Sequence, residues 1–169
     1  SFIEGLRDAS RTDIWKECES WARANVSLFK KVDAACLDSI SAQVCGSITL
    51  STLHGCPPQE IEKIATYLID KKHLHTFVKC NPTLLGYETA RRVLDGLGFG
   101  YVAFDDHHFK EDLQYADAVA MFKRLQALAD SKGVSFGVKL TNTCPVDNPQ
   151  DVLAGGEMYM SGRSLFPLT

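Results

Sequence analysis

Polar and titratable side chains follow four stretches of the chain that are typical of β-strands. They lie at residues 51–56, 79–81, 105–108 and 139–143, whereas the starts of the strand-like runs carry few such groups. In folds built from parallel strands, ligand sites lie at the carboxyl ends of the strands, where loops and the amino ends of helices meet. The four stretches therefore predict one shared polar site.

Lys79 and Lys139 lie inside two of the strand-like runs. Burying an ammonium group is costly unless an anion or an acceptor pairs with it, so lysines in strands usually have a specific partner. A flavin carbonyl or phosphate oxygen is one such partner, and a Schiff base with a carbonyl substrate is another reason for a buried lysine. The structural alternative is an internal ion pair with Asp105 or Asp106.

The Asp-Asp-His-His run at residues 105–108 offers carboxylates and imidazoles for general acid–base chemistry. A divalent metal ion is an alternative, with His54 or Cys56 as further ligands. Neighbouring side chains of an extended segment point to opposite faces, so at most two of the four can share one site. We select Asp105 and His107 as site residues and assign no metal. An Asp-capped turn with solvated histidines is the structural alternative.

His54 and Cys56 lie in a loop that leads into a helix beginning near Pro57. The positive end of a helix dipole favours a thiolate, so Cys56 is a candidate nucleophile or proton donor, and His54 a candidate proton donor. The other cysteines form no CxxC pair and are expected to be free thiols packed as small apolar residues. They are Cys18, Cys36, Cys45, Cys80 and Cys144.

A candidate anion site lies close to the end of the sequence. Ser161, Gly162, Arg163 and Ser164 offer backbone N–H groups, hydroxyls and a guanidinium in one short segment. This combination suits a phosphate or a carboxylate.

Composition narrows the class of protein. Of the 169 residues, 45% are hydrophobic and 23% are charged, which is typical of a globular domain. The formal net charge is -3, so the chain lacks the excess of basic residues that is typical of a nucleic-acid binder. No apolar run approaches the roughly 20 residues that cross a bilayer. The first ten residues carry charges where a signal peptide would be apolar. We therefore expect a cytoplasmic protein that binds neither nucleic acid nor membranes.

Periodicity predicts the elements that must position these groups. Apolar residues at helical spacing indicate a helical extension over residues 1–46, with a helix capped by Thr12 or Asp13. Strands are expected at residues 47–53, 75–80, 101–104 and 134–140, and a short element begins at Tyr159. Helices are expected at residues 57–72, 88–97 and 112–132. The strands should pair in parallel, because each helix returns the chain to the same end of the sheet.

The fold predicted from this alternation is α/β, with parallel βα repeats. A complete (β/α)8 barrel typically needs about 250 residues, so residues 47–169 correspond to part of a TIM barrel. We therefore expect the sequence to be a piece of a longer protein.

Several strings of residues resemble the selenate reductase subunit family, whose members are large bacterial iron–sulfur flavoproteins. The strings are LSTLHGCPP (50–58), HTFVKCNP (75–82), VAFDDHH (102–108), GVKLTNT (137–143) and MYMSGRSLFPLT (158–169). The resemblance covers essentially the whole chain. It implies an internal segment of an oxidoreductase that passes electrons between a reduced nicotinamide, a flavin and iron–sulfur centres.

More distantly, the region is similar to the flavin-binding barrels of dihydropyrimidine and dihydroorotate dehydrogenases. This likeness implies that Lys79 or Lys139 contacts the flavin. It also implies that Asn142 and Thr143 form the Asn-Thr end of a later strand, and that residues 161–163 hold the phosphate. The cofactor would be FMN or FAD, with iron–sulfur clusters and NAD(P)H bound outside this segment.

The prediction is therefore a barrel segment that contributes to a flavin or substrate site in a multidomain oxidoreductase. Its partners would be the remaining domains of the same polypeptide and a small-molecule substrate. We expect the isolated segment to be inactive and to form homo-oligomers, because an incomplete sheet exposes edge strands. Whether it retains flavin alone stays open. The alternatives are a Schiff-base lyase or aldolase barrel, and a non-catalytic degenerate barrel segment that docks other domains.

Overall fold

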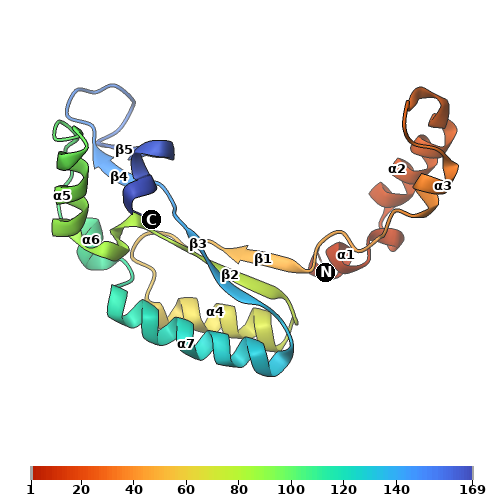
Figure 1. The fold of residues 1–169 in the computed structure, drawn as a ribbon, viewed down its shortest axis with the longest axis horizontal. Coiled ribbons are helices and arrows are strands. Elements are labelled where there is room, and N and C mark those ends of the chain that lie inside the picture. The colour runs from red at the N-terminus through yellow and green to blue at the C-terminus, as the bar shows by residue number, and fades with distance from the viewer. Residues whose placement is uncertain (1, 169) are drawn as a thin grey trace. The chain divides into compact units, whose positions relative to one another are not determined.

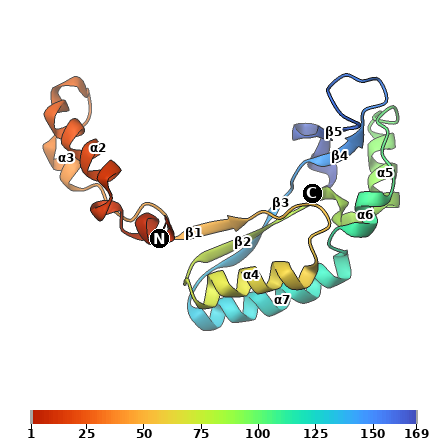
Figure 2. The same ribbon diagram turned by 180° about the vertical axis from the view of Figure 1, so that it is seen from behind.

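The computed structural model describes residues 2–168. The chain divides into two compact units, Ser1–Gly46 and Ser47–Thr169, and Figures 1 and 2 show the elements of each from opposite sides. No helix among the described residues is long and apolar enough to cross a membrane.

The first unit consists of short helices that bury little of their apolar surface. Its α-helices are α1 (Phe2–Arg7), α2 (Asp13–Ala24) and α3 (Ala34–Asp38). The hydroxyl of Thr12 accepts a hydrogen bond from the Trp15 N–H, which confirms the predicted helix cap. Of residues 2–46, only Ala9 is buried. An apolar core therefore contributes little to the stability of this unit.

The second unit contains a parallel sheet covered on one face by two helices. Its strands run in the order β1 (Ser47–Leu50), β2 (His75–Cys80) and β3 (Phe136–Leu140). Helices α4 (Pro58–Asp70) and α7 (Tyr115–Lys132) lie side by side against the sheet (Figure 1). The predicted parallel α/β arrangement is confirmed.

One hydrophobic core joins these helices to the sheet. Its buried residues are Ile61, Ala65, Ile69, Val78, Met121, Leu125 and Ala129. Leu50 and Phe136 pack against them from the flanking strands, so alternate residues of each strand point toward the helices. Gly133, with a φ of 66°, ends α7 in the left-handed conformation and confirms the predicted helix end.

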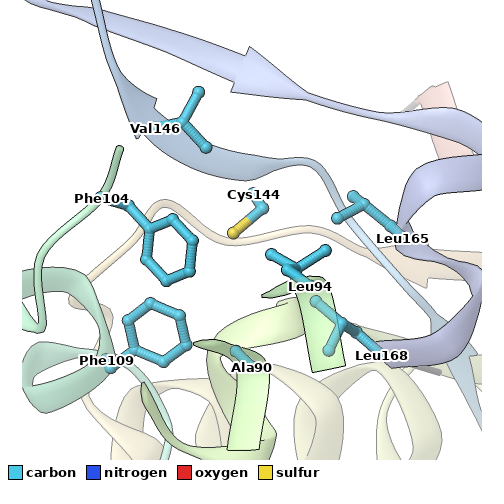
Figure 3. Packing of buried hydrophobic residues seen from close by; sticks show 8 residues of the cluster. All are labelled: Ala90, Leu94, Phe104, Phe109, Cys144, Val146, Leu165 and Leu168. Atoms are coloured by element: carbon cyan, nitrogen blue, oxygen red, sulfur yellow. The ribbon is translucent and has the colours of Figure 1, made fainter. Parts of the chain in front are cut away.

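A second core lies beside a small antiparallel sheet formed by β4 (Cys144–Asp147) and β5 (Glu157–Met160). Helices α5 (Tyr87–Gly96) and α6 (His107–Glu111) and the 3₁₀ helix η4 (Gly162–Leu168) contribute to it. Figure 3 shows its side chains, which are Ala90, Leu94, Phe104, Phe109, Cys144, Val146, Leu165 and Leu168. Strand β4 was not predicted, whereas the short element expected at Tyr159 is part of β5.

The prediction of a strand at residues 101–104 is wrong. This segment is irregular, and the Asp147 N–H donates to its Ala103 carbonyl at 2.8 Å. The guanidinium of Arg91 instead donates to the carbonyls of Val102 at 2.7 Å and Phe99 at 3.1 Å. Because a side chain occupies backbone acceptors that a neighbouring strand would use, the segment does not join a sheet.

A carboxylate at the end of α4, Asp70, links this helix to α7 and makes stability depend on pH. Asp70 hydrogen-bonds to Lys132 and Lys71, and these contacts lower its pKa from 3.8 to about 2. A carboxylate with a lowered folded-state pKa stabilises the fold above its unfolded-state pKa. That stabilisation disappears as the pH falls through the folded-state value.

We therefore expect the free energy of unfolding of the chain to fall as the pH decreases from about 4 to about 2. Urea unfolding at several pH values, followed by far-UV circular dichroism, measures this dependence. The variant Asp70→Asn should lose less stability over the same interval than the unmodified chain, because it lacks one of the titrating groups. Asp117→Asn, at an exposed position of α7, is the control and should behave as the unmodified chain does. An equal acid loss in the Asp70 variant would contradict the assignment.

Candidate functional site

A buried carboxylate, Asp112, lies at the centre of a hydrogen-bonded cluster. It is 4% exposed and follows α6 directly. Its Oδ2 atom accepts from Thr83 Oγ1 at 2.6 Å and Asn81 Nδ2 at 3.1 Å, and lies 2.7 Å from His54 Nδ1. Its Oδ1 atom accepts from the Gly55 N–H at 2.8 Å. Three side chains and one backbone amide therefore converge on a single carboxylate.

Asp112 is held in its ionised form. Burial acts to raise its pKa, but hydrogen bonds from His54, Thr83 and the Gly55 N–H, together with the charge of His54, outweigh burial and lower the pKa below its ordinary value. An ionised carboxylate only accepts hydrogen bonds, so the nitrogen of His54 that faces it carries a hydrogen. Asp112 thus fixes the orientation of the His54 ring.

The carboxyl ends of the three parallel strands are linked through this cluster. His54 follows β1, Asn81 follows β2, and Asn142 follows β3. The Asn142 side-chain amide donates to Asn81 Oδ1 at 3.0 Å, and the Asn142 N–H donates to the Cys80 carbonyl at 2.9 Å. Hydrogen bonds therefore link three of the four predicted polar stretches.

The two strand lysines are neighbours. Lys79 and Lys139 are paired in the register of β2 and β3, and they alternate with Val78, which points into the helical core. Both therefore lie on the sheet face opposite the helices. On the same face, the Phe77 ring would lie 2.8 Å from a Cβ atom added at Gly137. Positive charge and an aromatic ring thus lie on one open face.

The lysines do not form the ion pair with Asp105 or Asp106 that was the structural alternative. Asp106 instead pairs with Lys110 at 2.6 Å. Asp105 accepts a hydrogen bond from the His107 N–H at 2.9 Å. Lys139 is exposed, so the expected cost of burying its ammonium does not arise there.

Asp105 and His107 do not join the Asp112 cluster. Both are exposed, and the Asp105 side chain accepts a hydrogen bond from the N–H of His107, the first residue of α6, which agrees with the structural alternative of an aspartate-bonded turn. His107 Nε2 lies 3.4 Å from Glu111 Oε2. The adjacent His108 lies beside His54, with ring centroids 5.3 Å apart. The structure therefore places a different histidine of this run at the cluster.

Cys56 lies close to the cluster, just before α4. Its half-buried thiol lines a cavity of about 20 Å³, together with Lys79, Asn81 and Asp112. A cavity of this size holds about one water molecule. A larger ligand would have to occupy the open face of the sheet or the hollow beside β3.

That hollow has a volume of about 460 Å³ and is lined by Leu140, Thr141, Asn142, Gly162, Leu165 and Phe166. It brings the predicted cofactor-binding residues Asn142 and Gly162 together. The Thr143 hydroxyl lies 3.5 Å from Asn142 Oδ1. Ser161 and Arg163 are exposed and do not line the hollow.

The six cysteines carry thiols rather than disulfides, as predicted, but Cys18 and Cys36 are exposed and are not packed in a core. Cys80 and Cys144 are buried, and burial raises the pKa of each thiol to about 11, with the charge of Asp112 contributing at Cys144. Neither is therefore a nucleophile at neutral pH. Among residues 2–168, no group of three or more His, Cys, Asp or Glu side chains is arranged to hold a metal ion.

The sequence analysis missed Asp112 because it follows the mostly polar residues 107–111 and was taken as the first residue of a predicted helix, where aspartate commonly serves as a cap. It also did not single out Asn81, Thr83 and His108. Asn81 carried a signal, since it follows a strand directly. Nothing in the local sequence marks Thr83, which reaches Asp112 through the turn of the 3₁₀ helix η3 (Pro82–Leu85).

Taken together, the parallel sheet, its helical cover and the polar cluster at the strand ends define a barrel-type α/β domain. All of residues 1–169 match the family of the N-terminal TIM-barrel domain of oxidoreductase YgfK, and the chain belongs to this family. The predicted TIM-barrel fold class is thereby confirmed, and the name of the family is that of an oxidoreductase.

Two curated relatives are from Escherichia coli, one from strain K12 and one from O157:H7, and both carry the name "Putative oxidoreductase YgfK". Each is 52% identical to this chain over 130 residues, which is 77% of the chain and 13% of the relative. The chain therefore corresponds to a small part of these proteins. No solved structure matches it.

Proposed function

We propose that this chain is a barrel segment of a multidomain flavin and iron–sulfur oxidoreductase of the selenate reductase type, and that its strand ends contribute to a flavin or substrate site. The observation that carries the proposal is the placement of Lys79 and Lys139 side by side on the open sheet face. They lie next to Asn81 and Asn142, which are hydrogen-bonded to each other at the strand ends.

These groups suit a planar ligand that carries carbonyl and phosphate oxygens. The two ammonium groups supply positive charge for carbonyl or phosphate oxygens, and a flavin nucleotide carries oxygens of both kinds. Asn142 and the backbone of Gly162 line the hollow beside β3, where a phosphate or a ring edge would be accommodated. The Phe77 ring on the same face offers a surface on which a ring system can stack.

A reduction also needs a proton, and two groups are candidates for the donor. His54 is oriented by Asp112, and Cys56 lies two residues further along the same loop. NAD(P)H and iron–sulfur clusters would bind to other parts of the polypeptide, in the cytoplasm. The segment itself would supply charge, hydrogen bonds and a proton donor.

The test is a titration of FMN, and separately FAD, into the intact polypeptide that contains this segment, followed by flavin fluorescence. Binding should quench the fluorescence, and the double variant Lys79→Met, Lys139→Met should weaken flavin affinity by about tenfold or more, because charge-assisted hydrogen bonds are each worth about 1.5–3 kcal/mol. Lys123→Met, an exposed lysine of α7, is the matched control and should leave the affinity unchanged.

An unchanged flavin affinity in the double variant would exclude the lysines from the flavin site. In that case the unmodified polypeptide would be treated with borohydride and a carbonyl substrate. If the substrate were trapped on Lys79 or Lys139, the Schiff-base lyase would replace the flavin proposal.

A further inference from the structure

We infer that His54 and His108 form a two-nitrogen site for a divalent metal ion of the zinc class, separate in its chemistry from the proposed flavin site. The two rings come from different parts of the fold, the loop after β1 and helix α6, and their centroids are 5.3 Å apart. The inference rests on how each ring is held and on which nitrogens remain.

Each imidazole is oriented by its own carboxylate. His54 Nδ1 lies 2.7 Å from Asp112 Oδ2, and His108 Nε2 lies 2.8 Å from Glu157 Oε1. Because an ionised carboxylate only accepts hydrogen bonds, these two nitrogens carry the hydrogens in the neutral rings. The lone pairs therefore reside on the opposite nitrogens, His54 Nε2 and His108 Nδ1.

Those two nitrogens are buried and have no hydrogen-bond partner among residues 2–168. A buried polar atom without a partner is unfavourable by about 1–3 kcal/mol, so two such atoms in adjacent rings require an explanation. A cation that accepts both lone pairs would satisfy them together.

The arrangement matches what a metal requires of histidines. Ligating histidines typically donate their other ring N–H to a carboxylate, which fixes the tautomer, and both rings here do so. A tetrahedral zinc ion binds imidazole nitrogens at about 2.0–2.1 Å, which places two ligating ring centroids about 5 Å apart. The separation of 5.3 Å agrees with that value.

Since residues 2–168 supply no cluster of three ligating groups, the remaining metal positions would be filled by water or by a small ligand. An open position is a feature of catalytic zinc sites, which typically have three protein ligands, whereas structural sites are closed by four. A metal at His54 Nε2 would occupy the lone pair of that ring, and Cys56 would then be the proton donor of the proposed function.

The test is a titration of the 169-residue chain with Zn²⁺ alone, without flavin, followed by calorimetry and by NMR of ¹⁵N-labelled histidine rings. The His54 Nε2 and His108 Nδ1 resonances should shift together at a 1:1 ratio. The affinity for Zn²⁺ should fall by about tenfold or more in His108→Gln, which lacks one of the two ligands. It should fall by about 10–100-fold in Glu157→Gln, because the His108 ring then loses the carboxylate that fixes its tautomer. His73→Gln is the control, since His73 is an exposed histidine that lies outside the two elements carrying His54 and His108, and it should retain the affinity.

The inference is overturned if Zn²⁺ leaves both ring nitrogens unshifted, in which case a bridging water is the partner of the two lone pairs. It is equally overturned if His73→Gln weakens binding as much as His108→Gln does. The wild-type NMR titration decides the question even if a variant fails to fold. Because the assay contains no flavin, its outcome is independent of the lysine test above.

Discussion

Replacing Asp112 with alanine is expected to destabilise the chain by about 3 kcal/mol or more, because each buried donor left without an acceptor is unfavourable by about 1–3 kcal/mol. The substitution removes the acceptor of His54, Thr83, Asn81 and the Gly55 N–H at once. Urea unfolding followed by far-UV circular dichroism measures the effect. Tryptophan fluorescence is unsuitable, because both tryptophans lie in the first unit.

Asp117→Asn is the matched control for this substitution. Asp117 is an exposed aspartate in the first turn of α7, close in sequence to Asp112, and its replacement should change the free energy of unfolding by only a few tenths of a kcal/mol. A loss below about 0.5 kcal/mol in Asp112→Ala would be in the range of ordinary surface substitutions and would contradict a central role for this carboxylate.

Replacing Arg91 with methionine is expected to be the second large effect, about 2–3 kcal/mol, since hydrogen bonds from charged groups are worth about 1.5–3 kcal/mol each. Arg91 holds the carbonyls of Phe99 and Val102, binds Asp95, and stacks over the Phe104 ring at 4.4 Å. Without it, the segment around residues 99–104 should open and become sensitive to proteases. Limited proteolysis and urea unfolding report the two consequences.

Arg92→Met provides the control, because the neighbouring Arg92 is exposed and has none of the Arg91 contacts to the segment. It should unfold and be cleaved as the unmodified chain is. Equal protease sensitivity of the two variants would show that Arg91 does not hold the segment, and the explanation given for the missing strand would fail.

The parts of the fold that periodicity predicted correctly are those in which local preference and burial agree. Strand β2 was predicted at its observed bounds, because its residues are β-prone and alternate between the core and the open face. The strand expected at residues 101–104 has a similar apolar pattern. It fails because Arg91, ten residues earlier, binds its backbone, and such a tertiary contact leaves no mark on the local sequence.

The site was predictable in part for the same reason. Asn142 and His54 follow strands, and parallel pairing brings the carboxyl ends of the strands together independently of the loop conformations. Asp112 was counted as the first residue of a long helix, but α7 begins at Tyr115, because the Asp112 side chain is engaged by His54 and Thr83. The choice between His107 and His108 depends on the rotation of α6, which a four-residue run of polar side chains does not specify.

The most direct test of the central claim, that one buried carboxylate links the ends of three strands, is an ¹H–¹⁵N NMR comparison of the unmodified chain with Asp112→Asn. We expect the His54 Nδ1–H signal to be present in the unmodified chain and lost in the variant. The side-chain amide of Asn142 should also shift, although it reaches Asp112 only through Asn81. If the Asn142 amide and the His54 ring were unaffected, the three strand ends would not share a site.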